Sequence, residues 1–408
     1  MIVKLLLGIT GIASGSGARK DPCTRLNSLS YTEGENCYGL FWDGQRGTGR
    51  VCYFSEDDTD DEDSDVSCPR KEPVTPVEAE VLIERLYSLV RSSKDSTRPS
   101  PIPVSIERDI TPRHTKDTNN DAHTLPDMNL NVEKFGIVAL GDVGHQGTAL
   151  ESTTMAVQTK FASTASTGFL LGDNFYPIGV SSPTDAKFEH IFEGLIAQSL
   201  PGIPFHVVLG NHDWMGNVDA QIQFSSLNNQ WIMPSRFYRR RFVTRSAITC
   251  VWFLDTEKVR RREAQDQLSW LESTLSTDSS CSWRIVVGHH PVFDSGFYSD
   301  DIRMLLDVLP IMERYGVDMY ISGHEHQSRV YRKTDGRKPI TFLIAGAASE
   351  AVSGYAKPHK NLVWANTEAV SFLHLSISGS EISYAFINSQ GLNKPLHADS
   401  TSSNSAST

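Results

Sequence analysis

Five short apolar runs of this 408-residue chain each end in a glycine that is followed by a polar cluster. The runs lie at 135–140, 168–171, 205–209, 284–287 and 319–321. Continuous apolar runs of this length are typical of strands that are buried on both faces. A sixth run, at 248–254, lacks such a cluster, and amphipathic segments typical of helices lie between the runs, at 185–200, 265–275 and 301–315. Strands that alternate with helices in this way predict an α/β fold.

Three later apolar stretches have no long helix between them. They lie at 342–345, 371–377 and 382–387. We expect them to form a second, largely antiparallel sheet, because antiparallel strands need only short connections.

The polar clusters supply oxygen and imidazole ligands. They read Gly141-Asp142-Val143-Gly144, Gly172-Asp173-Asn174-Phe175-Tyr176, Gly210-Asn211-His212-Asp213, Gly288-His289-His290 and Gly323-His324-Glu325-His326. In open α/β sheets, ligands bind beyond the carboxyl ends of the strands. Asp, Asn, Tyr and His without thiolates suit hard cations, and this many donors serve two ions better than one. Any one cluster alone is typical of a turn or a helix cap, but five in this order predict a binuclear metal site.

With these motifs the sequence resembles the purple acid phosphatases of the small, tartrate-resistant type, within the calcineurin-like metallophosphoesterases. The resemblance spans residues 135–387 and includes the segments 210–222 and 267–271. It implies a β-sandwich of two mixed sheets flanked by helices. It also implies an acid phosphatase that hydrolyses phosphomonoesters at a binuclear metal centre.

The resemblance also implies a ligand set. Asp142, Tyr176 and His326 would hold a ferric ion, Asn211, His289 and His324 would hold divalent iron, zinc or manganese, and Asp173 would bridge the two ions. Gly144 stands where other metallophosphoesterases carry a histidine, and Tyr176 would replace that ligand. His145 comes one position late, so we do not expect it to be a ligand.

The implied reaction is in-line attack on phosphorus by water that the ferric ion has activated at acidic pH. His212 would be the catalytic residue, an imidazolium that stabilises developing charge and protonates the leaving group. The family usually carries another histidine shortly after His289, but here that region reads Phe297-Tyr298-Ser299. We therefore expect the leaving group to depend more on His212 alone. Trp214 stands at a position that varies among relatives, so we expect the rim of the pocket to differ.

Two alternative functions stay open at this point. One is a phosphodiesterase or protein phosphatase on the same fold, which Gly144 and Tyr176 disfavour because those enzymes use an Asp-x-His motif. The other is a non-catalytic, phosphatase-like scaffold. The complete ligand set and the lack of a C-terminal hydrophobic helix disfavour it.

The N-terminal sequence indicates secretion. Residues 1–18 combine one early positive charge with an apolar run and small residues, which is typical of a cleaved signal peptide, although an ordinary strand is the alternative. Six cysteines suit the oxidising compartment that follows: Cys23, Cys37, Cys52, Cys68, Cys250 and Cys281. Their even number favours disulfides over a zinc site or free thiols, but the early four allow three pairings. We expect a secreted or vesicular, lysosome-like location.

The remaining sequence divides by composition. Residues 19–133 are predicted to be an acidic, cysteine-containing extension with an acid block at 56–65, a helix at 78–91 and a linker from 92. The acid block lacks the spacing of a calcium loop. Residues 134–392 are the predicted catalytic domain, and 393–408 are a predicted disordered tail. The net charge of −11 disfavours nucleic acid as a partner, and the lack of a long apolar stretch disfavours a transmembrane segment.

Overall fold

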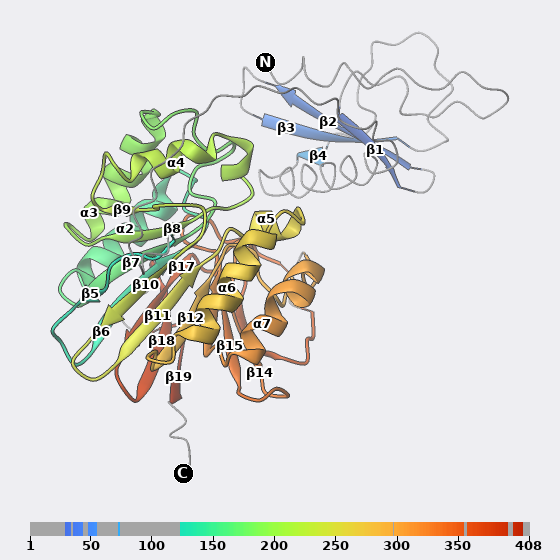
Figure 1. Ribbon diagram of the computed structural model, residues 1–408. Coiled ribbons are helices and arrows are strands. Elements are labelled where there is room, and N and C mark those ends of the chain that lie inside the picture. The colour runs from blue at the N-terminus through green and yellow to red at the C-terminus, as the bar shows by residue number, and fades with distance from the viewer. Residues whose placement is uncertain are drawn as a thin grey trace, which may run out of the picture. The chain divides into compact units, whose positions relative to one another are not determined.

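The computed structural model describes residues 29–33, 36–43, 48–54, 72–73, 123–296, 298–354, 357–390 and 395–402. The chain forms two compact units, Met1–His114 and Thr115–Thr408 (Figure 1). The described part of the first unit is an antiparallel sheet in the order β1-β2-β3-β4. Its strands are β1 (Leu29–Glu33), β2 (Asn36–Asp43), β3 (Thr48–Phe54) and β4 (Glu72–Pro73). The predicted signal peptide, acid block and helix at 78–91 lie outside the described residues.

The second unit contains two mixed sheets, as the resemblance to the metallophosphoesterases implies. The seven-stranded sheet has the order β19-β18-β17-β6-β7-β8-β9, and the eight-stranded sheet has the order β16-β14-β15-β13-β12-β11-β10-β5. The first is built from β6 (Phe135–Leu140), β7 (Ala165–Leu171), β8 (Phe205–Val208), β9 (Trp231–Ile232), β17 (Ser371–Ile377), β18 (Glu381–Asn388) and β19 (His397–Ser402). The second is built from β5 (Met128–Asn129), β10 (Tyr238–Val243), β11 (Ile248–Phe253), β12 (Trp283–Val287), β13 (Met319–Ser322), β14 (Ser328–Lys333), β15 (Ile340–Ala345) and β16 (Leu362–Asn366).

The central strands are apolar throughout because both of their faces are buried. In β6, Ile137 and Ala139 pack into the core between the two sheets, whereas Val138 and Leu140 pack into the core beneath the helices. Successive side chains of a strand point to opposite faces, so a strand between two apolar layers requires an unbroken apolar run.

Helices cover the outer face of each sheet (Figure 1). Over the seven-stranded sheet lie α2 (Thr148–Phe161), η5 (Phe188–Ile196), α3 (Ala197–Ser199) and α4 (Val218–Phe224), with the short turn η6 (Asp213–Met215) before α4. Over the eight-stranded sheet lie α5 (Thr256–Arg260), α6 (Gln265–Thr277), η7 (Met304–Val308) and α7 (Leu309–Arg314). The three helical segments predicted within the second unit are therefore present.

The structure corrects the prediction of a separate antiparallel sheet. The β15 strand pairs in parallel with β13, and β17 pairs antiparallel with β6, so the late strands extend both sheets. The sequence shows only that no helix intervenes, and either pairing satisfies that condition.

Both predicted edges of the catalytic domain also differ from the structure. Residues 397–402 form β19 rather than a disordered tail, because the strand pairs with β18, Asp399 accepts from Arg332 at 2.9 Å and His397 stacks on Trp364. At the other edge, β5 in the predicted linker pairs with β10 of the second unit. Polar composition predicted a linker and a disordered tail, but the backbone groups of polar residues can also pair with a neighbouring strand, as they do here.

One disulfide lies in the described region. It joins Cys250 of β11 to Cys281 just before β12, with the Cα atoms 5.7 Å apart. A disulfide is thus confirmed, as the even number of cysteines predicts.

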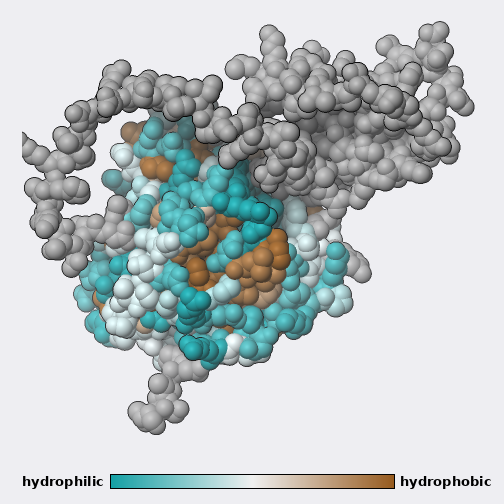
Figure 2. All heavy atoms as spheres, turned by 45° about the vertical axis from the view of Figure 1, so that its right-hand side comes forward, coloured by the Kyte–Doolittle hydropathy of each residue, from teal (hydrophilic) through white to brown (hydrophobic). Residues whose placement is uncertain are grey.

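The surface of the described residues is mixed. Figure 2 shows hydrophobic side chains gathered in the middle of the face it presents and in a smaller area near its upper left, with hydrophilic surface between and around them. Ile302 and Leu306, beside and within η7, are among the large apolar side chains that are exposed. Within the described residues, no helix combines the length and the apolar character needed to cross a membrane.

Candidate binuclear metal site

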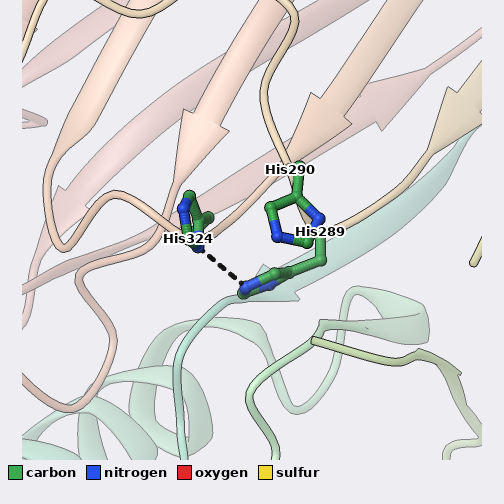
Figure 3. A group of neighbouring side chains, drawn as sticks. All are labelled: His289, His290 and His324. Carbon is green, nitrogen blue, oxygen red and sulfur yellow. Dashed lines mark hydrogen bonds between the residues drawn. The ribbon is translucent and has the colours of Figure 1, made fainter. Parts of the chain in front are cut away.

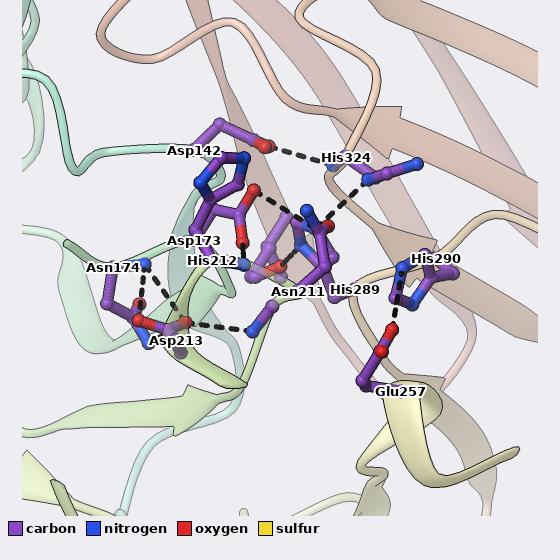
Figure 4. Close-up of polar contacts among 12 residues, drawn as sticks. Asp142, Asp173, Asn174, Asn211, His212, Asp213, Glu257, His289, His290 and His324 are labelled. Carbon is purple, nitrogen blue, oxygen red and sulfur yellow. Dashed lines mark hydrogen bonds and ion pairs between the residues drawn. The ribbon is translucent and has the colours of Figure 1, made fainter. Parts of the chain in front are cut away.

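The site forms where the carboxyl ends of strands from both sheets meet. Asp142 follows β6, Asp173 follows β7 and Asn211 follows β8 in one sheet, while His289 follows β12 and His324 follows β13 in the other. Figure 4 shows these side chains converging from the two sheets. Every one of them is buried.

The first group of donors surrounds the hydroxyl of Tyr176. Its oxygen lies 3.2 Å from Oδ1 of Asp142, 3.1 Å from Oδ2 of Asp173 and 2.9 Å from Nε2 of His326. His326 Nε2 is 3.6 Å from Oδ1 of Asp142. Three oxygen donors and one imidazole nitrogen therefore face one point, which is a ligand set for a hard cation.

The second group surrounds His289. Its Nε2 atom lies 3.0 Å from Oδ1 of Asn211 and 3.2 Å from Nδ1 of His324 (Figure 3), and it is 3.5 Å from Oδ2 of Asp173. Nδ1 of His289 donates to the carbonyl of Leu171 at 2.8 Å, so a neutral ring directs the lone pair of Nε2 into this group. Because Oδ2 of Asp173 contacts both groups, Asp173 is placed to bridge two cations.

The backbone holds three of these residues in an uncommon conformation. Asp142, Asp173 and His324 have φ of 58°, 51° and 71°, and they are three of the five non-glycine residues with positive φ in the described chain. Such a conformation costs about 1–3 kcal/mol per residue and is concentrated at functional sites. Tight turns after the strands thus aim the side chains inward at some expense of stability.

Gly144 makes room for Tyr176. A Cβ atom at Gly144 would lie 2.5 Å from the backbone nitrogen and 2.7 Å from Cδ2 of Tyr176. A side chain at position 144 therefore does not fit against segment 175–176 as it lies here, so a glycine at this position permits the observed place of Tyr176.

The buried carboxylates and histidines perturb one another strongly. Burial raises the pKa of Asp142 to about 6, although His289 and His326 oppose this shift. Burial would also raise the pKa of Asp173, but His289 and His212 hold it well below its ordinary range. The pKa of His289 would fall on burial, but Asp173 raises it to about 10. The anionic field that holds this proton would equally hold a cation, so the residues fit a metal centre.

His212 lies beside the first group. Its backbone N–H donates to Oδ1 of Asp173 at 2.9 Å, and its Nδ1 donates to the carbonyl of Pro177 at 2.7 Å. The ring contacts Tyr176 edge-on, with centroids 4.6 Å apart. His212 thus lies beside the candidate metal ligands, and we do not count it among them.

Comparison with known proteins agrees with this geometry. Residues 135–328 match the family model described as calcineurin-like phosphoesterase. The tartrate-resistant acid phosphatase type 5 of Oryctolagus cuniculus is 30% identical over 250 residues, which cover 54% of this chain and 75% of that protein. The chain belongs to the calcineurin-like metallophosphoesterases, in the purple acid phosphatase family.

Solved structures agree on the fold. A structure described as GAP50, the anchor in the inner membrane complex of Plasmodium, has a TM-score of 0.59 at 21% identity. The match covers 66% of this chain and 89% of the GAP50 chain. The purple acid phosphatase PPD1 of yellow lupin has a TM-score of 0.51 at 14% identity and covers 66% of this chain and 54% of its own. At these identities the likeness shows the fold alone.

For this family member, the structure brings together all eight residues named from the sequence. They are Asp142, Asp173, Tyr176, Asn211, His212, His289, His324 and His326. His290, next to His289, turns to other partners: its Nδ1 is 2.8 Å from Oγ1 of Thr256 and its Nε2 is 2.9 Å from Nη1 of Arg260. Its ring contacts the rings of His289 and His324, with centroids 4.9 Å and 4.6 Å apart (Figure 3).

Sequence reasoning missed the role of Asp213 within the family motif. Its carboxylate accepts from the backbone N–H of Gly210 at 2.8 Å, from that of Asn174 at 3.1 Å and from Nε2 of Gln221 at 2.8 Å (Figure 4). It thereby ties the loop after β7 to the loop after β8. The only indication in the sequence was its position in the cluster Gly210-Asn211-His212-Asp213, and an aspartate in such a cluster is equally typical of a helix cap.

Tyr298 occupies the region in which the family usually has a second histidine. Its ring stacks on His324 at 4.5 Å, and its backbone N–H donates to Oε1 of Glu325 at 3.3 Å. The guanidinium groups of Arg236 and Arg261 lie over the ring of Trp214, at 4.8 Å and 4.4 Å from its centroid. An aromatic ring thus lies beside His324 in place of the second histidine, and a different pocket rim at Trp214 stays a prediction.

Proposed function

We propose that this chain is an acid phosphatase that hydrolyses phosphomonoesters at a binuclear metal centre. The single observation that carries the proposal is the Tyr176 hydroxyl, which lies within 3.2 Å of Asp142, Asp173 and His326 and fits against Gly144. A phenolate with two carboxylates and an imidazole suits a ferric ion. The amide and imidazoles of the second group suit divalent iron, zinc or manganese.

The bound metals would supply activated water at acidic pH and a positive charge for the phosphate oxygens. Asp173 would keep the two halves of the centre at a fixed separation, because its carboxylate contacts both groups. Nδ1 of His212 donates to the carbonyl of Pro177, so Nε2 would be the atom that faces the phosphate ester. His212 would hold a proton at that atom and donate it to the leaving oxygen.

The two alternative functions have less support. The Asp-x-His motif of the phosphodiesterases and protein phosphatases is incompatible with the contact between Gly144 and Tyr176. The likeness to the Plasmodium anchor protein concerns the fold alone. The seven candidate donors are all buried and converge on one place, which supports a metal centre and, with it, the catalytic proposal.

The test is metal analysis together with the visible spectrum of the purified protein. Iron bound by Tyr176 gives phenolate-to-iron charge transfer, so the oxidised, iron-loaded protein should be coloured. Tyr176→Phe should lose the band and keep the fold by circular dichroism. An iron-loaded, oxidised protein without a visible band would remove the assignment of Tyr176, and absence of phosphomonoester hydrolysis would remove the proposed function.

We also propose that the protein is exported. The support is the apolar segment at 1–18 and the disulfide between Cys250 and Cys281, which suits an oxidising compartment. Expression in a secreting cell should yield protein in the medium whose N-terminus begins close to residue 19. Retention of the intact segment in the cell would contradict this.

A further inference from the structure

Two residues outside the eight lie against the first group of donors. His145 follows Gly144, and its ring stacks on Tyr176 with centroids 4.0 Å apart and planes 17° apart. Glu350 lies in the loop after β15, and its Oε2 is 3.4 Å from Nε2 of His145 and 3.7 Å from Nδ1 of His326. One carboxylate oxygen therefore faces both histidines.

The loop that carries Glu350 is fixed to the site by its own hydrogen bonds. The backbone N–H of Ala348 donates to the carbonyl of Gly141, and the hydroxyl of Ser349 donates to the carbonyl of Asp142. On the far side of Glu350, the N–H of Val352 donates to the carbonyl of His326 at 2.9 Å. These bonds tie the loop to the turns after β6 and β13. Glu350 is thus held in place, unlike a mobile surface carboxylate.

The position of the Glu350 carboxylate favours the tautomer of His326 that carries its hydrogen on Nδ1. Nε2 of this ring points to Tyr176 and Asp142, so Nδ1 is the nitrogen that faces Glu350. A carboxylate beside Nδ1 favours a hydrogen there and leaves the lone pair on Nε2, inside the donor group. The negative charge also makes the imidazole a stronger donor.

His145 acts on Tyr176 from the other direction. The tyrosine ring has His145 parallel to one face and the edge of the His212 ring at 4.6 Å. The backbone of Gly144 packs against the same tyrosine, so its ring has close neighbours on several sides. Glu350 in turn faces the Nε2 of His145 and limits its rotation.

We propose that Glu350 is a positioning residue for the first half of the metal centre, orienting His326 directly and Tyr176 through His145. The inference rests on the proposed function only in that the first half holds a metal ion. In this proposal neither Glu350 nor His145 contacts the substrate.

The experiment measures metal binding and spectrum rather than turnover alone. Metal-free full-length protein is titrated with Co²⁺ and, separately, reconstituted with iron, for the wild type, Glu350→Ala, Glu350→Gln and His145→Phe. Glu381→Gln is the matched control, because Glu381 is exposed at the start of β18. Through β17, that end of β18 lies on the same side of the sheet as the start of β6, away from the strand ends that carry the site. Circular dichroism and thermal unfolding of the metal-free proteins verify the fold.

We expect Glu350→Ala to weaken one of the two metal-binding events by about 10–100-fold, the usual effect of removing a partner of a ligating histidine. It should also shift the iron charge-transfer band, while the other binding event is unchanged. Glu350→Gln keeps an acceptor of the same size, so its affinity should fall less than that of Glu350→Ala, with the band still shifted by loss of the charge. His145→Phe keeps the stacked ring and should retain most of the affinity.

Affinities and bands of Glu350→Ala and Glu350→Gln equal to those of Glu381→Gln would overturn the proposal, as would a wild-type protein that binds no metal. An equal loss at both binding events would also overturn it, because Glu350 contacts only one group. A wild type that binds two metals but hydrolyses no phosphomonoester would refute the proposed function and leave the result on Glu350 standing.

Discussion

Gly144→Ala tests the steric link between the glycine and the tyrosine ligand. The added Cβ would lie 2.5 Å from the backbone nitrogen of Tyr176, 2.7 Å from its Cδ2 and 2.8 Å from the nitrogen of Phe175. Two of these three atoms are backbone, so a change of side-chain rotamer cannot relieve the contact. Phe175 is itself buried in the helix-side core, which resists its movement.

The size of the displacement follows from these distances. Ordinary Cβ contacts begin near 3.4 Å, so the segment 175–176 must move by roughly half an ångström to one ångström to accept a methyl group. Metal–ligand distances tolerate only about 0.2 Å, so the Tyr176 oxygen would leave the first group of donors. We expect loss of the visible band, weaker iron binding and a destabilisation of about 1–3 kcal/mol.

The matched control is Gly147→Ala, three residues away. A Cβ at Gly147 would meet no atom within 4 Å, and its φ of 165° is extended backbone that alanine adopts. Visible spectra, iron content and denaturant unfolding should therefore change in Gly144→Ala and not in Gly147→Ala. A Gly144→Ala protein with the wild-type band and full iron content would refute the steric argument.

Three further predictions concern other parts of the second unit. His212→Ala should lower kcat by about 10²–10⁴-fold with both metals bound, and steady-state kinetics should show a larger loss for alkyl than for aryl phosphates; equal losses would contradict an acid role. Burial raises the pKa of Asp255 to about 7 from 3.8, so its ionisation destabilises the fold as pH rises through that window. Asp255→Asn, which can still accept from Trp214, should match the wild type near pH 4 and exceed its unfolding free energy by up to about 4 kcal/mol near pH 8, and parallel pH profiles would contradict this. Replacing Cys250 and Cys281 by alanine should cost about 3–4 kcal/mol in denaturant unfolding for a loop of 31 residues, and an unchanged midpoint would contradict this.

The strands and the polar clusters that follow them were predictable because each depends on local sequence, whereas the roles of the individual donors were implied by the family resemblance. An unbroken apolar run that ends in glycine and a polar residue marks a buried strand and the turn after it, as at Phe135–Leu140 and Asp142. The pairing of the strands was not predictable. The polar β19 strand is ordered by hydrogen bonds to β18, and β15 joins the eight-stranded sheet beside β13, which no local pattern encodes.

The residues that contact the donors from outside the site, such as Glu350, could not be predicted from the sequence for a different reason. Glu350 lies 24 positions after His326 in sequence yet faces its ring, and nothing in the segment around it differs from an ordinary loop. Gly144 shows the opposite case, in which a missing side chain is informative. A Cβ at Gly144 would occupy space that the backbone of Phe175 and Tyr176 and the ring of Tyr176 already fill, so the place of the tyrosine depends on the glycine. Variants that introduce a side chain at Gly144 therefore test the ligand role of Tyr176 without altering the tyrosine.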